Sequence, residues 1–353
     1  MLSFVYESLP GRVVFGAGSL DRLGAEIDRL GLQRVLVLAT PPQHGQADDV
    51  SRRLGHRAVG VHARAVMHVP VETARLACAE ATRLGADGTV AIGGGSTIGL
   101  AKAIARDLGL PIVAVPTTFA GSEMTPIWGL TEGGAKKTGR DPRVLPRLVI
   151  YDPVLTLTLP PSIAGPSGMN AIAHCVEALY AENANPVISL MAEEGIRALA
   201  ASLPAVVAKG DDLAARATAL YGAWLAGAAL GAVGMALHHK LCHTLGGSFN
   251  LPHAETHTII LPHATAYNRA AAPEAMARIA RALGGVGDPA AGLYDLARRI
   301  GAPAGLKEIG LGAADLDRAA TLATTNPYFN PRPVTRDGVR ALLEDAYHGR
   351  RPA

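Results

Sequence analysis

The sequence has 353 residues, of which 49% are hydrophobic and 18% are charged, and its formal net charge is +3. A chain of this length and composition is expected to fold into a globular protein with more than one hydrophobic core. The basic residues are scattered rather than clustered, so we expect neither nucleic acid nor a membrane surface as a partner.

The first 150 residues alternate between segments typical of strands and segments typical of helices. Apolar runs predict strands at 34–39, 88–95 and 111–118, and helical periodicity predicts helices at 71–85 and 96–109. Residues 4–18 have the pattern of two strands around a turn, and a helix is expected to begin near Ser19. Such alternation predicts an α/β domain with a mainly parallel sheet, which we place at residues 1–155.

The pattern changes after about residue 152, where long segments rich in alanine and leucine replace the strand signals. These segments predict helices at 168–183, 187–208, 212–236, 273–284 and 288–301. Residues 151–168 are rich in proline and glycine and form a suitable junction. The sequence therefore predicts an all-α second domain at residues 156–353.

One uncharged segment, residues 217–237, has the length of a membrane-spanning helix. Alanine and glycine dominate it, so we expect a helix buried in a dense core instead. The N-terminus lacks the features of a signal peptide. The three cysteines, Cys78, Cys175 and Cys242, are too few and too widely spaced for a disulfide framework. We therefore expect a reducing compartment, the cytoplasm.

A glycine-rich turn connects the predicted strand at 88–95 to the following helix. The turn consists of Gly93, Gly94, Gly95, Ser96 and Thr97. Glycines let the backbone approach an anion, and the N-terminus of the helix offers unpaired N–H groups, so this turn predicts a pyrophosphate site. It matches neither standard dinucleotide motif, and a tight turn without a ligand is the alternative.

Hydroxyl side chains follow the next predicted strand. They belong to Thr117, Thr118, Ser122 and Thr125. Ligands of open α/β folds bind at the carboxyl ends of the strands, which favours a binding role for these hydroxyls. A polar turn stabilised by its own side chains is the alternative.

Histidines are concentrated in the second domain, where four of the twelve lie between residues 238 and 253. His239 and His243 are four residues apart and share one face of a helix that we expect Pro252 to end. Asn170 and His174 have the same spacing on another helix, and His253 is able to fold back toward both. A metal site, a site of proton transfer and ordinary packing of core histidines all remain possible interpretations.

Four segments together resemble the iron-containing, or group III, alcohol dehydrogenases over essentially the whole chain. They are GGGSTIGLAKAIA (93–105), PTTFAGSEMTP (116–126), the segment from LVIYDP to ALYA (148–181), and the segment from HTLGG to TAYN (243–268). The resemblance implies an NAD(P)-binding α/β domain followed by a helical domain, an architecture shared with dehydroquinate synthase. Residues 4–23 and 136–153 are most similar to the branch of the family that reduces maleylacetate.

The resemblance assigns the pyrophosphate of the cofactor to the glycine turn at residues 93–97. It assigns further cofactor contacts to Thr117, Thr118 and the neighbouring Ser122. Relatives selective for NAD often carry aspartate at the position of Thr40, and threonine would not repel the 2′-phosphate of NADPH. We therefore expect NADH, NADPH or both as cofactors.

The metal-dependent members of the family bind their ion with one aspartate and three histidines. The matching positions here are Asn170, His174, His239 and His253, whereas His243 matches a histidine near the nicotinamide. Because a neutral amide replaces the carboxylate, we expect no metal and interpret the cluster as a polar pocket for substrate and proton transfer. A weak metal site that retains three imidazoles is the alternative. Lys240 and Arg332 are candidate partners for substrate carboxylates.

The expected reaction is hydride transfer from NAD(P)H to the conjugated carbon–carbon double bond of maleylacetate, a small dicarboxylate. The product is 3-oxoadipate, an intermediate in the breakdown of aromatic compounds. The alternatives are a metal-dependent alcohol or polyol dehydrogenase, a lyase similar to dehydroquinate synthase, and a cofactor-binding protein without catalysis. Members of the family usually form dimers or larger assemblies, so we expect a homodimer.

Overall fold

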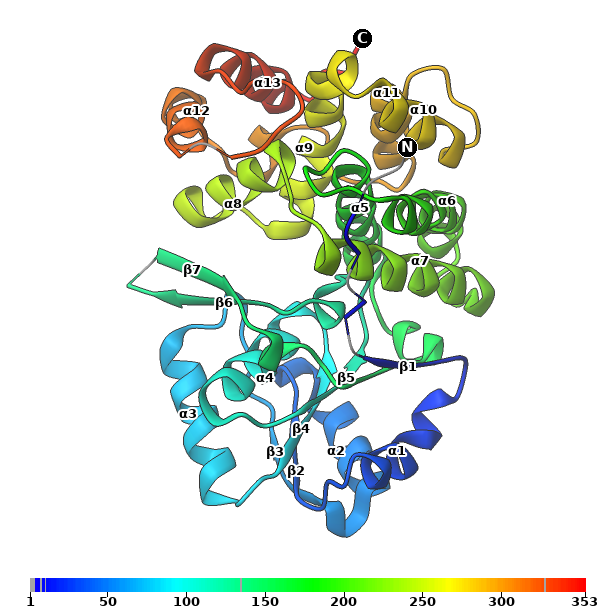
Figure 1. Ribbon diagram of the computed structural model, residues 1–353, viewed down its shortest axis with the longest axis vertical. Helices are drawn as coiled ribbons and strands as arrows, with labels where there is room; N and C mark the ends of the chain where they lie inside the picture. Colours follow the sequence, from blue (N-terminus) through cyan, green and yellow to red (C-terminus); the bar gives the residue numbers. More distant parts are fainter. Residues whose placement is uncertain (1–3, 7, 10, 134, 327) are drawn as a thin grey trace. The chain divides into compact units, whose positions relative to one another are not determined.

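The computed structural model describes residues 4–6, 8, 9, 11–133, 135–326 and 328–353 (Figure 1). The chain forms two compact units, one of residues 9–159 and one of residues 160–353 together with the described part of residues 1–8. The opening residues thus group with the helical unit and not with the α/β unit, where we placed them. The division between the units follows residue 159, close to the boundary that we placed after residue 155.

The α/β unit contains a six-stranded parallel sheet in the order β1-β8-β5-β4-β2-β3. Its strands are β1 (Arg12–Phe15), β2 (Val35–Leu38), β3 (Ala58–His62), β4 (Gly88–Gly93), β5 (Ile112–Pro116) and β8 (Leu148–Tyr151). The helices of this unit are α1 (Leu23–Arg29), α2 (His44–Leu54), α3 (Val71–Arg83) and α4 (Gly95–Leu108). The expected α/β class and the five elements predicted at 34–39, 71–85, 88–95, 96–109 and 111–118 are confirmed.

The inner strands β2 and β5 are apolar at every position because both faces of the sheet are covered. Val35 and Val37 of β2 lie in one core with side chains of α1 and α2. Leu36 and Leu38 of the same strand lie in a second core with side chains of α3 and α4. The alternation of side chains along a strand thus divides an unbroken apolar run between two faces.

The strand order reverses between β2 and β4. From β2 the chain continues to β3 on one side, and it then crosses back to β4 on the other side of β2. In open α/β sheets, ligands bind beyond the carboxyl ends of the strands at such a reversal. The turns that follow β2 and β4 therefore mark the expected position of a ligand.

Two parts of the α/β unit differ from the expectation. Within residues 4–18, β1 is the only strand in the part that the structure describes, and it pairs with β8, more than 130 residues away along the chain. Ser19 begins a 3₁₀ turn (Ser19–Arg22) that leads into α1. An antiparallel hairpin of β6 (Ile127–Glu132) and β7 (Ala135–Arg140) was not predicted, because its second strand carries little apolar alternation.

The helical unit contains nine α-helices in its described residues. They are α5 (Pro161–Ala178), α6 (Pro186–Ala208), α7 (Leu213–Ala232), α8 (Leu237–Phe249), α9 (His253–Asn268), α10 (Pro273–Ala282), α11 (Pro289–Arg299), α12 (Leu316–Thr324) and α13 (Arg336–His348). The expected all-α character is confirmed.

Several helix boundaries in this unit differ from the sequence prediction. Helix α5 begins at Pro161, inside the segment that we assigned to the junction, because proline is compatible with the first turn of a helix. The helix expected at 212–236 ends at Ala232 and is followed by α8 after a break. No single helix in the described residues is long and apolar enough to cross a membrane. The bent pair of α7 and α8, at 95°, passes that test by length and composition only.

Lys102 fastens α4 to the turn that follows β5. Its ammonium group is buried and donates hydrogen bonds to the carbonyl oxygens of Ser122, Thr125 and Ile127 at 2.7–2.8 Å, and it lies 2.9 Å from Thr125 Oγ1. The Ser122 carbonyl also accepts from the backbone N–H of Thr125 at 3.2 Å and from Thr125 Oγ1 at 3.1 Å, and the lysine adds a donor to all three carbonyl groups. The helix that begins at the glycine turn and the hydroxyl-rich turn after β5 are therefore held together by one side chain.

We predict that Lys102→Met lowers the free energy of unfolding by about 3 kcal/mol, because several buried carbonyl groups lose a donor. Urea denaturation followed by circular dichroism measures this change. Lys137→Met is the control, because Lys137 is exposed and pairs with Glu132 at the surface, and we expect no measurable effect. Equal stability of the two variants would contradict the anchoring role of Lys102.

Candidate functional site

The glycine turn after β4 is shaped by close contacts at two of its three glycines. Gly93 has a φ of 151°, and a Cβ there would collide with Thr97 and with the side chain of Gln43. A Cβ on Gly94 would lie 2.9 Å from the side chain of Thr118. Gly95, the first residue of α4, faces open space, with nothing within 4 Å of a Cβ built there. The turn therefore leaves room for a ligand at the N-terminus of a helix of 14 residues.

Side chains from two other strand ends meet at the same edge. Thr40, after β2, donates from its hydroxyl to Gln43 Oε1 at 3.0 Å, and Gln43 Nε2 donates to Thr117 Oγ1 at 2.8 Å. The backbone N–H of Thr117 in turn donates to the carbonyl of Gly93 at 3.1 Å. Gln43 was missed by the sequence analysis, although its position in the turn between β2 and α2 is a signal that could have identified it.

The structure thus brings most of the expected cofactor residues together at the strand reversal. They are Thr40, Gly93, Gly94, Gly95, Ser96, Thr97, Thr117 and Thr118. Ser122 lies farther along the chain, in a 3₁₀ turn (Ser122–Met124), and its carbonyl accepts a hydrogen bond from Lys102. Among the described contacts, none links the Ser122 hydroxyl to the glycine turn.

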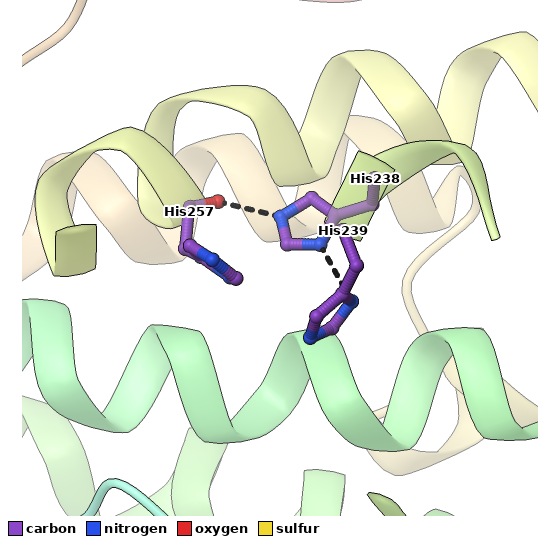
Figure 2. Close-up of side chains that lie close together, drawn as sticks. All are labelled: His238, His239 and His257. Atoms are coloured by element: carbon purple, nitrogen blue, oxygen red, sulfur yellow. Dashed lines mark hydrogen bonds between the residues drawn. The ribbon is translucent and has the colours of Figure 1, made fainter. Parts of the chain in front are cut away.

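In the helical unit, histidines from three helices form a cluster. Helix α5 carries His174, α8 carries His238, His239 and His243, and α9 carries His253 and His257. The ring centroids of His174 and His239 are 5.1 Å apart, those of His243 and His253 are 6.5 Å apart, and those of His253 and His257 are 4.2 Å apart. Figure 2 shows that His238, His239 and His257 come from α8 and α9 and lie above α5.

The loop between α8 and α9 differs from the expectation. Pro252 does not end the helix of His239, because α8 ends at Phe249 and Asn250 follows in the left-handed conformation with a φ of 54°. Pro252 is instead the N-cap residue of α9, which begins at His253. His253 is thereby brought back beside His243.

Glu177 of α5 organises the start of α8. This carboxylate is completely buried and accepts hydrogen bonds from the backbone N–H groups of Ala236 at 3.0 Å, His238 at 2.7 Å and His239 at 3.4 Å. It also lies 2.7 Å from His239 Nδ1. Burial raises the pKa of Glu177, and the backbone donors at the N-terminus of α8 act in the opposite direction by stabilising its charge. Glu177 therefore caps α8 and orients one of its histidines.

Burial lowers the pKa values of four imidazoles in the cluster, those of His174, His238, His239 and His257, which favours their neutral form. Burial, reinforced by neighbouring histidines, lowers the pKa values of His174 and His257 well below the usual range, and it lowers the pKa of His238 to about 4. Burial also lowers the pKa of His239, the ring beside Glu177. Because His239 donates a hydrogen bond from Nδ1–H to the Glu177 carboxylate, the lone pair of that ring lies on Nε2.

Several of these buried groups have no hydrogen-bond partner among the described residues. They are Asn170 Oδ1, His174 Nδ1, His239 Nε2 and both ring nitrogens of His257. Buried polar atoms are rarely left unpaired in folded proteins, and those that are often face a ligand. Each of these residues is able to donate one lone pair, since a neutral imidazole carries a proton on one nitrogen and a lone pair on the other, and a metal ion requires such lone pairs of its ligands.

The two candidate partners for substrate carboxylates differ in their surroundings. Lys240 is half-buried, and its ammonium group lies 5.6 Å from the centre of the Tyr328 ring. Arg332 stacks on the Tyr267 ring at 4.2 Å and donates to the Tyr267 carbonyl at 3.2 Å. The guanidinium of Arg332 is thus engaged in packing, and Lys240 is the better candidate of the two.

Comparison with known proteins gives full-length matches. A family model described as iron-containing alcohol dehydrogenase matches residues 10–153, and its C-terminal counterpart matches residues 165–347. The maleylacetate reductase of Burkholderia cepacia is 62% identical over 353 residues, covering 100% of both chains, and that of Sphingobium indicum is 58% identical over 351 residues, covering 99% of both. A crystal structure of maleylacetate reductase from Agrobacterium tumefaciens superposes with a TM-score of 0.96 at 54% identity, covering 100% of both chains.

These matches contradict the expectation that no metal takes part. Both matching family models describe iron-containing enzymes, so the family implies a bound iron or another divalent metal ion. The residues present fit such an ion in kind, because His174 and His239 are neutral and each has a buried nitrogen without a partner. The amide at Asn170 removes a charge from the site, but it leaves an unpaired oxygen. The prediction that no metal binds was wrong because it relied on the missing carboxylate and gave too little importance to the remaining nitrogen donors.

We predict that Gly95→Val weakens the binding of NADH by about tenfold or more, because the side chain would fill the space in which the backbone meets an anion. Fluorescence titration with NADH measures the dissociation constant, and the melting temperature reports on folding. Gly24→Val, at a helical position that is equally open in the same unit, is the control and should leave the affinity unchanged. Unchanged affinity of the Gly95 variant would place the pyrophosphate elsewhere.

A second prediction concerns Glu177. Replacement by alanine should lower the free energy of unfolding by about 3 kcal/mol, because buried N–H groups at the start of α8 lose their acceptor. Urea denaturation is the measurement, and Glu182→Ala, at an exposed position in the same unit, is the control. Comparable loss of stability in the two variants would show that Glu177 has no special part in capping α8.

Proposed function

This chain belongs to the iron-containing alcohol dehydrogenase family, and on that premise we propose the roles that its residues play in one reduction. The chain is an NAD(P)H-dependent oxidoreductase that converts maleylacetate into 3-oxoadipate. The main support for this function is the sequence identity of 62% with the Burkholderia cepacia enzyme over the full length of both chains. This agrees with the reaction expected from the sequence.

The cofactor is assigned to the carboxyl edge of the parallel sheet. The open space at Gly95 and the N-terminus of α4 suit the pyrophosphate. The hydrogen-bonded set of Thr40, Gln43 and Thr117 lines the same strand ends. Thr40 has no carboxylate that would repel a 2′-phosphate, which supports the use of both NADH and NADPH.

The histidine cluster is assigned to the substrate. Hydride from NAD(P)H adds to the alkene carbon β to the ketone, and the electron pair of the double bond moves to form an enolate. A proton is then added at the α carbon, which gives 3-oxoadipate and NAD(P)⁺. His243 and His253 are placed to donate hydrogen bonds or this proton, and half-buried Lys240 attracts a substrate carboxylate.

Asn170, His174, His239 and His253 are the residues that would hold a divalent metal ion. When bound, such an ion supplies Lewis-acid stabilisation of the negative charge that develops on the substrate. Independently of the ion, Glu177 holds the His239 ring with Nε2 available, and Asn170 contributes a neutral oxygen. The homodimer and the cytoplasmic location stay predictions.

The activity is tested by following the oxidation of NADH and of NADPH by absorbance in the presence of maleylacetate. We expect one equivalent of 3-oxoadipate for each equivalent of cofactor oxidised. Oxidation of a primary alcohol or a polyol by NAD⁺, without turnover of maleylacetate, would instead identify a dehydrogenase of the more general type.

We predict that His243→Ala and His253→Ala each lower kcat by about a hundredfold, because each removes a positioned donor near the developing charge. The dissociation constant for NADH should change less than threefold or so, since the glycine turn is untouched. Steady-state kinetics and melting temperatures separate this loss from unfolding. The exposed His348→Ala variant is the control, and near-normal kcat in both test variants would remove these residues from the mechanism.

A further inference from the structure

His257 is the histidine that neither the sequence motifs nor the proposed reaction explains. It lies on α9 one turn after His253, and its side chain is fully buried. Neither of its ring nitrogens has a hydrogen-bond partner among the described residues. A buried imidazole with both nitrogens unpaired destabilises the folded protein unless a ligand satisfies it.

The surroundings of His257 indicate what that ligand is. Its ring lies 5.0 Å from that of His239, 4.8 Å from that of His238 and 4.2 Å from that of His253. His238, His239 and His257 each offer a nitrogen, and the three atoms lie within 4.8 Å of one another (Figure 2). The nearest carboxylate, that of Glu177, already accepts hydrogen bonds from backbone N–H groups and lies beside His239 Nδ1. Buried nitrogens without a partner remain on His239 and His257, and such neutral nitrogen donors suit a transition-metal ion rather than an organic cation.

Two hydrogen bonds hold this group in place. His238 Nε2 donates to the backbone carbonyl of His257 at 2.9 Å and so ties α8 to α9 beside the cluster. His239 Nδ1 donates to the buried carboxylate of Glu177 at 2.7 Å. A carboxylate behind a ligating histidine fixes its tautomer and increases the basicity of the opposite nitrogen.

We propose that His257 is a metal-binding residue, and that this chain replaces the missing carboxylate at Asn170 with an additional imidazole. The inference rests on the metal site that the family implies. It adds His257 to the four residues at the family's metal-binding positions, which are Asn170, His174, His239 and His253. A nitrogen-rich, uncharged set of ligands favours Zn²⁺ or Co²⁺ over Fe²⁺, because affinity at such sites rises along the divalent series. The site is therefore expected to select zinc over iron.

The test uses the full-length protein after dialysis against a chelator, titrated with Co²⁺ and followed by visible absorption. We expect His257→Gln to weaken Co²⁺ binding by about tenfold or more and to change the spectrum. His263→Gln is the matched control, because His263 is also buried on α9 with an unpaired Nε2 and has no recorded ring contact with another described histidine. It should bind Co²⁺ like the unaltered protein.

A second variant, in which metal binding would create a new absorption band, tests the proposal even if His257→Gln fails to fold. His257→Cys should give a sulfur-to-cobalt charge-transfer band, because a thiolate at this position would join the ion, whereas His263→Cys should not. Absence of the band, or Co²⁺ binding by His257→Gln with unchanged affinity and spectrum, would overturn the proposal. Competition between Zn²⁺ and Fe²⁺ tests the selectivity, and tighter binding of Fe²⁺ would overturn that part.

These measurements do not depend on turnover. Maleylacetate reduction is assayed separately on the same preparations. If Co²⁺ binds at His257 but the protein does not reduce maleylacetate, the proposed function alone is contradicted. If the protein reduces maleylacetate but His257 does not take part in Co²⁺ binding, the proposed metal site alone is contradicted.

Discussion

The buried carboxylate of Glu177 is the interaction on which the histidine cluster depends. Its two oxygens accept hydrogen bonds from backbone N–H groups at the start of α8, and one of them, Oε2, also lies 2.7 Å from Nδ1 of the His239 ring. A negative charge is favourable at that position because the N-terminus of a helix carries partial positive charge. The stability of the fold and the orientation of a functional imidazole are therefore set by one side chain.

Lys102 has the corresponding part in the α/β unit. Its ammonium group holds the carbonyls of the turn after β5, and Glu123 in that turn accepts a hydrogen bond from the Tyr151 hydroxyl at 2.9 Å. The turn is thereby fixed to both α4 and β8. In each unit, a buried ionisable side chain with polar partners positions the backbone near a ligand site, so altering it is expected to affect stability and ligand binding together.

The amide of Asn170, at the position where metal-binding relatives have an aspartate, removes one negative charge from the cluster. Other side chains that are able to bind a metal ion remain. His174 and His239 retain unpaired nitrogens, and His257 adds another. Since all these rings are held neutral by burial, their lone pairs are available to an ion at neutral pH. The chemistry of the site is thus better described by its full set of donors than by the one position that departs from the family pattern.

The sequence by itself determined the α/β and helical classes, the glycine turn, and the family to which the chain belongs. These follow from local patterns: apolar runs, helical periodicity and motifs that are continuous along the chain. The tertiary structure alone decided the contributions of Gln43, Glu177, His238 and His257, because each acts through a residue distant in the sequence or a neighbouring helix. It also decided that Pro252 is the N-cap residue of α9, since local propensity does not specify which of two adjoining helices a proline flanks.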